Sequence, residues 1–524
     1  MLRLLEPTIA TKIQKMKERV QWQHPLMVTS GIDQTRFVLE DGHDQESFSF
    51  LVIGDSGSGS HGYHDPQRRI AAQMLPHHAD CQFLLHTGDV VYQCGSHEQY
   101  PANFIQPYRE FLVGGDRPDQ IAYDQMVFAL PFLPVLGNHD YYDLPRLHSL
   151  LAPLTQPLQR LLRQPLRRNI GRYGSGQGDA FARAFLDYSQ DLTLDELACH
   201  LNRHYDAQTE RGRCLRYQPG QFTRLPNRYY SFRYGGIDFF ALDSNTLNAP
   251  SPLPSDQYGE SYRQMLQAHR RAIAAAEAEV FDEAARLQAT LPEAAEQLDA
   301  LRGKLEQLVE VQRDIDKQLA AQGAETVDMD QLIWLQERLI ASWQNPQVRG
   351  RILFFHHPPY VSEATKWWQG QTLAVRQHLR WALDGAATAV GQNRGDRPLV
   401  DLVLSGHAHC FEYLRTLNTG HADSNLSWVV CGGSGLSLRR QRPAGAELDE
   451  VFPKKAYPYR EKRLVAKSQL FVGLNGQQQQ QRRPYSFLRI DVQTGAKPQF
   501  VLRPYVSERH HQTWRDYSLD AIVL

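Results

Sequence analysis

The sequence has few cysteines and no C-x-x-C pair. Its six cysteines are far apart along the chain: Cys81, Cys94, Cys199, Cys214, Cys410 and Cys431. A zinc knuckle or a disulfide scaffold requires cysteines at short, regular spacings. We therefore expect neither of these, and we expect the protein to work in a reducing compartment.

Long apolar runs and an excess of charge are also missing. The N-terminus has no signal-peptide pattern, and no apolar run reaches the length that spans a bilayer. We therefore predict a cytoplasmic protein without membrane contact. The 57 lysines and arginines balance 58 aspartates and glutamates, which gives a net charge of -1. This balance gives no reason to expect nucleic acid as a partner.

Short, nearly continuous apolar runs are present instead. They include "SFSFLVIGD", "CQFLLHTGD", "PFLPVLGNHD", "RILFFHHPPY", "DLVLSGHAH" and "LSWVVCGGSG". Such runs are typical of strands that are buried on both faces of a sheet. They predict an α/β fold in which polar residues gather where the strands end.

The first of these runs leads into a glycine-rich loop. From Gly57 the loop has the G-x-G-x-x-G spacing of a dinucleotide-binding turn. However, Asp55 stands where the pyrophosphate of a dinucleotide would lie. Asp80 has about the spacing of a ribose-binding acid, but it precedes its strand instead of ending it. A dehydrogenase is therefore the weakest interpretation of this loop.

Potential metal ligands end several of the apolar runs. They are Asp55, Asp89, Tyr92, Asn138, His139, His356, His407 and His409. Two neighbouring cations repel each other unless an anionic ligand bridges them, and Asp89 is the natural bridge. A two-metal pair can orient a phosphoryl group and activate water. Carboxylate, imidazole and amide ligands suit iron, manganese or zinc.

As a set, these motifs resemble the calcineurin-like metallophosphoesterases, and in particular their purple acid phosphatase branch. The motifs are G-D-x-G at 54–57, G-D-x-x-Y at 88–92, G-N-H-D at 137–140, His356 before the prolines, and G-H-x-H at 406–409. The resemblance implies a four-layer α/β/β/α sandwich with helical insertions. It also implies a binuclear metal centre.

One departure from the wider superfamily concerns the first motif. Most members carry D-x-H there, but Gly57 occupies the position of the histidine. The purple branch makes the same exchange and uses a tyrosinate, which Tyr92 would supply. A phenolate is a hard anionic donor and favours Fe(III). The alternative interpretation of Tyr92 is a buried phenol of the core.

The resemblance implies a role for each matching residue. The first metal, Fe(III), would be held by Asp55, Asp89, Tyr92 and His409. The second, an iron, zinc or manganese ion, would be held by Asp89, Asn138, His356 and His407. His356 is preferred over its neighbour His357 because the family places this ligand two residues before the proline.

The residues expected to act on the substrate follow from the same motifs. Asn138 would hold a phosphoryl oxygen, and His139 would stabilise developing charge or protonate the leaving oxygen. His61 and His64, in the loop after Asp55, are tentative substrate-binding residues. The alternative is that both are simply exposed, because loop histidines have no forced role.

The segments outside the motifs suggest the domain organisation. We predict an N-terminal extension (1–46), a metallophosphoesterase core (47–435), a loop-rich basic insertion (436–483) and C-terminal strands that complete the core (484–524). The core would carry a helical cap (153–217) and a helical hairpin (260–322). The arginines of the cap would either be solvated or approach an anionic substrate. The apolar seam of the hairpin would either close the hairpin or form a homodimer.

The expected activity is the hydrolysis of phosphate monoesters of small molecules by in-line attack of a metal-bound hydroxide, as in an acid phosphatase. A phosphodiesterase acting on nucleotides would use the same site. A protein Ser/Thr phosphatase is disfavoured, because it needs the D-x-H histidine and an arginine where Leu136 stands. From another class, a non-catalytic metal-binding scaffold would use the hairpin to bind a partner.

Overall fold

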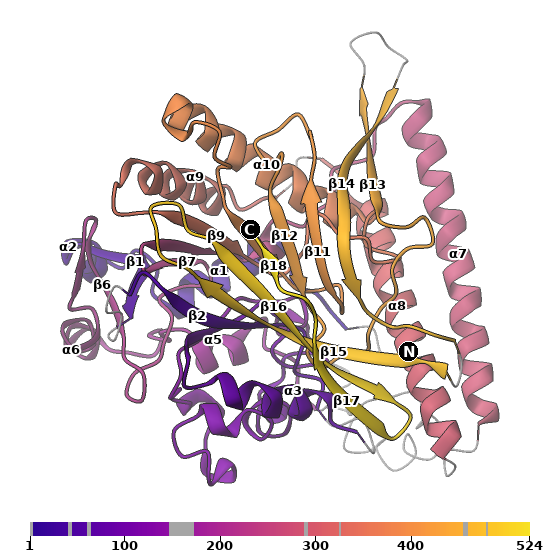
Figure 1. The fold of residues 1–524 in the computed structure, drawn as a ribbon, viewed down its shortest axis with the longest axis horizontal. Coiled ribbons are helices and arrows are strands. Elements are labelled where there is room, and N and C mark those ends of the chain that lie inside the picture. Colours follow the sequence, from indigo (N-terminus) through magenta and orange to yellow (C-terminus); the bar gives the residue numbers. More distant parts are fainter. Residues whose placement is uncertain are drawn as a thin grey trace.

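A computed structural model describes residues 4–39, 45–59, 64–145, 172–287, 292–323, 326–453, 460–477 and 480–524. Within these ranges the chain forms two β-sheets that lie face to face, with helices outside them (Figure 1). Among the described residues, no helix is both long enough and apolar enough to cross a membrane.

The larger sheet has 11 strands among the described residues. Its order is β13-β14-β11-β12-β10-β9-β8-β7-β1-β6-β5. The strands that carry the centre of the sheet, β8, β9, β10 and β12, pair in parallel. Their bounds are β1 Ile32–Leu39, β5 Ala207–Thr209, β6 Gly212–Tyr217, β7 Tyr230–Tyr234, β8 Ile237–Ala241, β9 Gly350–Phe354, β10 Leu402–Ser405, β11 Phe411–Thr416, β12 Ser427–Cys431, β13 Glu447–Pro453 and β14 Arg460–Val472.

The smaller sheet has seven strands among the described residues, in the order β17-β16-β15-β2-β3-β4, with β18 paired to β16. Strands β2, β3 and β4 are parallel to one another, and β15 to β18 join them in antiparallel fashion. Their bounds are β2 Phe48–Ile53, β3 Cys81–His86, β4 Phe132–Pro134, β15 Arg482–Val492, β16 Phe500–His510, β17 Thr513–Ser518 and β18 Ile522–Val523.

Aromatic side chains fill the space between the two sheets. Phe50 and Phe83 of the smaller sheet meet Phe239 of the larger sheet with ring centroids 5.5 and 5.3 Å apart. Phe83 also contacts Phe232 at 5.4 Å. These edge-to-face contacts are a favourable geometry for buried rings. They place the main hydrophobic core between the sheets.

Helices cover the outer faces of the sandwich. Helices α9 (Met329–Gln344) and α10 (Gly370–Val390) form a second core with the larger sheet, in which Leu335 and Leu379 pack with Val403. Helix α3 (Pro66–Met74) packs on β15 of the smaller sheet. The predicted α/β fold with four layers, α/β/β/α, is therefore confirmed.

The remaining α-helices of the described residues are α1 (Ile9–Arg19), α2 (Pro25–Thr29), α5 (Asp179–Phe185), α6 (Leu194–His204), α7 (Gln257–Arg286) and α8 (Pro292–Ala320). Helices α7 and α8 pack against each other along one edge of the molecule (Figure 1). Leu298, Leu301 and Leu305 of the apolar seam contact Val280 of α7, so the hairpin buries its own seam.

Three segments that the sequence separates from the core supply strands to it. The N-terminal extension contributes β1, the described part of the cap contributes β5 and β6, and the basic insertion contributes β13 and β14. The first part of the cap, 153–171, lies outside the described residues. The division into domains itself stays a prediction.

Candidate metal centre

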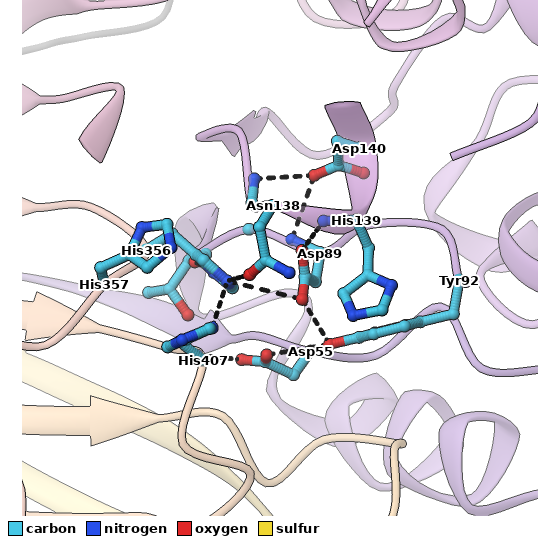
Figure 2. A network of polar contacts seen from close by, with 12 residues as sticks. Asp55, Asp89, Tyr92, Asn138, His139, Asp140, His356, His357 and His407 are labelled. Carbon is cyan, nitrogen blue, oxygen red and sulfur yellow. Dashed lines mark hydrogen bonds and ion pairs between the residues drawn. The ribbon is translucent and has the colours of Figure 1, made fainter. Parts of the chain in front are cut away.

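The strand ends of both sheets meet at one place. Asp55 follows β2 and Asp89 follows β3 in the smaller sheet, and His356 follows β9 in the larger one. His407 follows β10, so residues that come after four different strands meet in the same cluster (Figure 2). Ligands collect at this edge because the carboxyl ends of parallel strands lie together.

One half of the cluster is built around the Tyr92 hydroxyl. This hydroxyl donates to Asp89 Oδ2 at 2.6 Å and lies 3.0 Å from Asp55 Oδ1. His409 Nε2 lies 3.4 Å from the hydroxyl oxygen of Tyr92 and 3.6 Å from Asp55 Oδ1. Four potential donor atoms thus surround one small volume.

The other half of the cluster is built around His356 Nε2. This nitrogen lies 3.0 Å from Asn138 Oδ1, 3.1 Å from His407 Nδ1 and 3.4 Å from Asp89 Oδ2. Asp89 therefore belongs to both halves, as expected for a bridging carboxylate. Asn138 donates its amide to Tyr142 Oη at 2.9 Å, which turns its oxygen toward the cluster.

Backbone carbonyls orient two of the imidazoles. His356 Nδ1 lies 2.8 Å from Thr87 O, and His409 Nδ1 lies 3.1 Å from Ser437 O. A carbonyl only accepts hydrogen bonds, so the proton of each ring sits on Nδ1. Nε2 of each ring then faces the cluster. This arrangement is typical of metal-binding histidines.

His356 and His357 compete for the position of the ligand. Nitrogens of His356, His357 and His407 lie close enough to hold one ion. However, His357 Nδ1 bonds to Ser244 Oγ at 2.8 Å, and its Nε2 lies 3.4 Å from Asn248 Nδ2. Both nitrogens of His357 thus have protein partners. The choice of His356 over His357 stays a prediction.

Burial and close charges shift several pKa values in the cluster. Burial raises the pKa of Asp55 to about 7, and the nearby Asp89 carboxylate adds to this rise. Burial, followed by the charges of Asp55 and Asp89, raises the pKa of Tyr92 well above its usual value. Burial lowers the pKa of His407 and His409 well below the usual value, so both rings are neutral, as ligands must be.

The backbone at four of the predicted ligands is strained. Asp55, Asp89, His407 and His409 have φ angles of 54°, 56°, 68° and 40°, in the left-handed region that residues other than glycine rarely adopt. Such strain persists where the surrounding structure enforces it, and it is common at functional sites. Here it turns four donor side chains toward one another.

The missing histidine of the first motif has a steric explanation. A Cβ atom at Gly57 would lie 1.8 Å from the carbonyl oxygen of Val90. The Tyr92 amide also donates to Gly57 O at 2.7 Å, so the two loops are in direct contact. A side chain at position 57 would push away the loop that delivers Tyr92. The presence of Tyr92 at the cluster therefore depends on a glycine at position 57.

His139 lies beside the cluster without joining it. Its backbone amide donates to Asp89 Oδ1 at 2.8 Å, and its Nδ1 lies 2.6 Å from Gln93 O. Nε2 is therefore the nitrogen left to meet a substrate. The next residue, Asp140, accepts the amide protons of Gly137 and Asp89 at 2.8 and 3.1 Å and so fixes both loops (Figure 2).

The two tentative substrate residues are not placed at the cluster. His61 lies outside the described residues. Burial lowers the pKa of His64, and the charged neighbours that affect it are Arg509, Glu296, Asp299 and Arg483. None of these is a predicted metal ligand, so nothing in the described contacts ties His64 to the cluster.

The structure adds residues that the motifs do not reveal. Lys366 Nζ lies 2.8 Å from His407 Nε2 and forms an ion pair with Glu310 of α8. Arg313, one turn further along α8, lies 4.2 Å from the ring of Tyr142. Only the charge of these residues is visible in the sequence, because their partners lie far away along the chain.

A comparison with family models gives one match. Residues 48–257 match the calcineurin-like phosphoesterases. Residues 48–257 are thus similar to a calcineurin-like phosphoesterase domain, the family that the motifs resemble. The matched range holds Asp55, Asp89, Tyr92, Asn138 and His139, while the later histidines lie beyond it.

Comparisons with other proteins are less specific. No curated protein matches the chain. Similar solved structures include the purple acid phosphatase PPD1 of yellow lupin (Lupinus luteus), at 12% identity and TM-score 0.41, covering 91% of this chain and 53% of that one. GAP50 of Plasmodium, the anchor in the inner membrane complex, has 12% identity, TM-score 0.37 and coverages of 90% and 88%. PhoD has 13% identity, TM-score 0.36 and coverages of 91% and 72%. The chain thus spans about half the length of the lupin protein.

The side chains of the cluster include groups that could hold a metal ion. Each half of the cluster offers oxygen and nitrogen donors, and no thiol lies among them. The six cysteines are free thiols. The pKa values of Tyr92 and Asp55 are raised, as expected for acidic groups that are crowded together without a cation.

Proposed function

We propose that the protein hydrolyses phosphate monoesters at a binuclear metal centre. The observation that carries this proposal is the position of Asp89, which lies within 3.4 Å of both Tyr92 Oη and His356 Nε2. A carboxylate shared by two donor groups is what a bridged two-metal site requires. We infer that the substrates are phosphoesters from the similarity of residues 48–257 to calcineurin-like phosphoesterases.

In the proposed site, one ion binds Asp55, Asp89, Tyr92 and His409. The other binds Asp89, Asn138, His356 and His407. When bound, the two ions neutralise charge on the phosphoryl oxygens and lower the pKa of the attacking water. A hard phenolate donor favours Fe(III) at the Tyr92 position, with iron, zinc or manganese at the other.

The chain's own residues position the reaction. Asn138 presents its oxygen to the cluster because Tyr142 holds its amide nitrogen. His139 is fixed through its backbone to Asp89 and through Nδ1 to the Gln93 carbonyl. Its Nε2 is then placed to hold a proton for the leaving oxygen.

The test is metal analysis of the purified protein combined with two substrates. An aryl phosphate and a bis-aryl phosphate separate a monoesterase from a diesterase, and we expect faster turnover of the monoester. Faster turnover of the diester would favour the phosphodiesterase. Protein with two bound metals that turns over neither ester would support the scaffold instead.

Removal of His139 should slow the chemical step. We expect His139→Ala to lower kcat by about 10²- to 10⁴-fold, the usual range for one general acid or base. Metal content should not change, because His139 is not one of the proposed ligands and its backbone bond to Asp89 stays in the variant. Steady-state kinetics and metal analysis check this, with His139→Gln as a conservative comparison. Wild-type kcat in both variants would exclude the role.

Tyr92 should give the site a visible colour. A phenolate bound to Fe(III) produces a charge-transfer band in the visible region, so we expect this band in the wild type and its loss in Tyr92→Phe. Tyr142→Phe is the matched control, because its hydroxyl contacts Asn138 Nδ2 but no other predicted donor. A colourless wild type that contains iron would show that Tyr92 is not a ligand.

A further inference from the structure

Helix α8 of the hairpin lies directly beside the metal centre. Its Glu310 pairs with Lys366, which contacts His407. The carbonyl of Gly303 accepts a hydrogen bond from Arg439 at 2.6 Å, and Arg439 N donates to His409 O. The inserted hairpin, which the family motifs do not cover, therefore forms part of the surroundings of the site.

Arg313 of α8 lies near Tyr142 and His139, beside the residues expected to meet a substrate. Its guanidinium lies 4.2 Å from the ring of Tyr142, and that ring lies 4.9 Å from the ring of His139. Tyr142 Oη in turn holds the amide of Asn138. Burial lowers the pKa of His139, and the positive charge of Arg313 adds to this effect. Arg313 is thus close to the residues that are expected to touch a phosphoryl group.

Other cations around Arg313 already have carboxylate partners. Lys12 and Lys317 both pair with Glu6, at 2.7 and 2.8 Å, and Lys366 pairs with Glu310. Arg313 forms no ion pair with the described residues; it contacts the ring and the hydroxyl of Tyr142, and the charges of Glu6 and Glu310 lie nearby. A guanidinium has five N–H groups, so the contact with Tyr142 leaves others to meet an anion.

A cavity of about 820 Å³ opens next to Arg313. Its lining combines apolar groups such as Leu4 and Val309 with polar and charged ones, among them Gln312, Glu6 and Lys317. Asn248, another lining residue, reaches His357 beside the cluster. The volume falls in the range of pockets that bind small molecules.

We propose that Arg313 binds a phosphoryl oxygen of the substrate and that this cavity holds the leaving group. The inference rests on the proposed function and names its substrate class: phosphate monoesters of a small organic alcohol with apolar and polar groups. A guanidinium suits this role because its planar N–H groups match phosphate oxygens in pairs. The inserted hairpin would thereby set the specificity of the domain.

The first experiment measures binding of inorganic phosphate to the metal-loaded protein by calorimetry. We expect Arg313→Gln to weaken binding by about 10- to 100-fold, as for the loss of hydrogen bonds to a charged group. Arg313→Lys should recover part of the loss. The matched control is Lys304→Gln, which removes an exposed cation from the same helix and should bind like the wild type.

Metal content and folding are checked in each variant, since Arg313 does not touch a predicted metal ligand. Wild-type phosphate affinity in Arg313→Gln would overturn the proposal, as would equal losses in Arg313→Gln and Lys304→Gln. A wild type that does not bind phosphate would overturn it too. Because binding is measured without turnover, lack of esterase activity would count against the proposed function alone.

The second experiment fills the cavity. We expect Gln312→Trp to raise KM for an aryl phosphate by about 10-fold or more, because the leaving group would lose a pocket of small-molecule size. Binding of inorganic phosphate, which has no leaving group, should stay within twofold of the wild type. An unchanged KM for the aryl ester, in a variant that folds and binds phosphate normally, would show that the leaving group lies elsewhere.

Discussion

Replacement of Asp89 by alanine should remove bound metal and lower kcat/KM by at least ~10³-fold, or about 4 kcal/mol of transition-state stabilisation. Asp89 accepts from Tyr92 Oη at 2.6 Å, lies 3.4 Å from His356 Nε2, and accepts the His139 amide at 2.8 Å. Both halves of the cluster therefore lose a donor at once. The anionic bridge that offsets repulsion between two cations is lost as well.

The measurement is metal content per protein together with turnover of an aryl phosphate. Asp187→Ala is the matched control, because Asp187 is also buried and also bonds to a histidine and a tyrosine. Its partners, His200 at 2.8 Å and Tyr205 at 2.7 Å, lie outside the cluster. The control should keep its metals. Full activity in Asp89→Ala would disprove the proposed site.

The place where these side chains gather was predictable because several of them follow recognisable strands. Asp55, Asp89 and His356 come directly after apolar runs, and parallel strands bring such ends to one edge. The exchange of a histidine at Gly57 for Tyr92 could also be read from the motifs. Its physical cause could not, because the contact between Gly57 and Val90 joins two loops whose spacing only the fold determines.

The local sequence around the hairpin residues near the site does not indicate that they lie there. Glu310 and Arg313 belong to a helix whose apolar seam predicts a hairpin but not where the hairpin docks. Lys366 lies 41 residues before His407 in the sequence, yet the two side chains touch. Charged residues on a helix are usually solvated, so only their tertiary contacts distinguish these three.

Strand β14 shows that a basic composition does not by itself predict a loop. The segment "REKRLVAKSQLFV" is basic and was expected to be loop-rich, but it pairs with β11 and β13 near the edge of the larger sheet. Strands near a sheet edge often carry lysine and other charges, which discourage pairing with other chains. The alternation of buried Ala466 and Ser468 with exposed Lys467 and Gln469 indicates a strand better than the overall charge does.

The largest loss of stability should follow from Arg228→Ala. Arg228 pairs with Asp243 at 3.3 Å and with Asp328, and these side chains are 1%, 0% and 2% exposed. Removing the cation leaves two buried carboxylates without their partner, which costs about 3–5 kcal/mol. Tyr141 Oη also donates to Asp243 at 2.8 Å, so the loop that carries Asn138 should loosen as well.

Urea unfolding of the metal-free protein measures this loss without a contribution from metal binding. Arg228→Lys should retain part of the stability, because a lysine keeps the charge but cannot bond to two carboxylates in one plane. The control is Arg117→Ala: Arg117 lies 3.9 Å from Asp116, and the two side chains are 70% and 80% exposed. Its free energy of unfolding should change by less than about 0.5 kcal/mol. Equal effects of Arg228→Ala and Arg117→Ala would mean that the buried network does not hold the two sheets and α9 together.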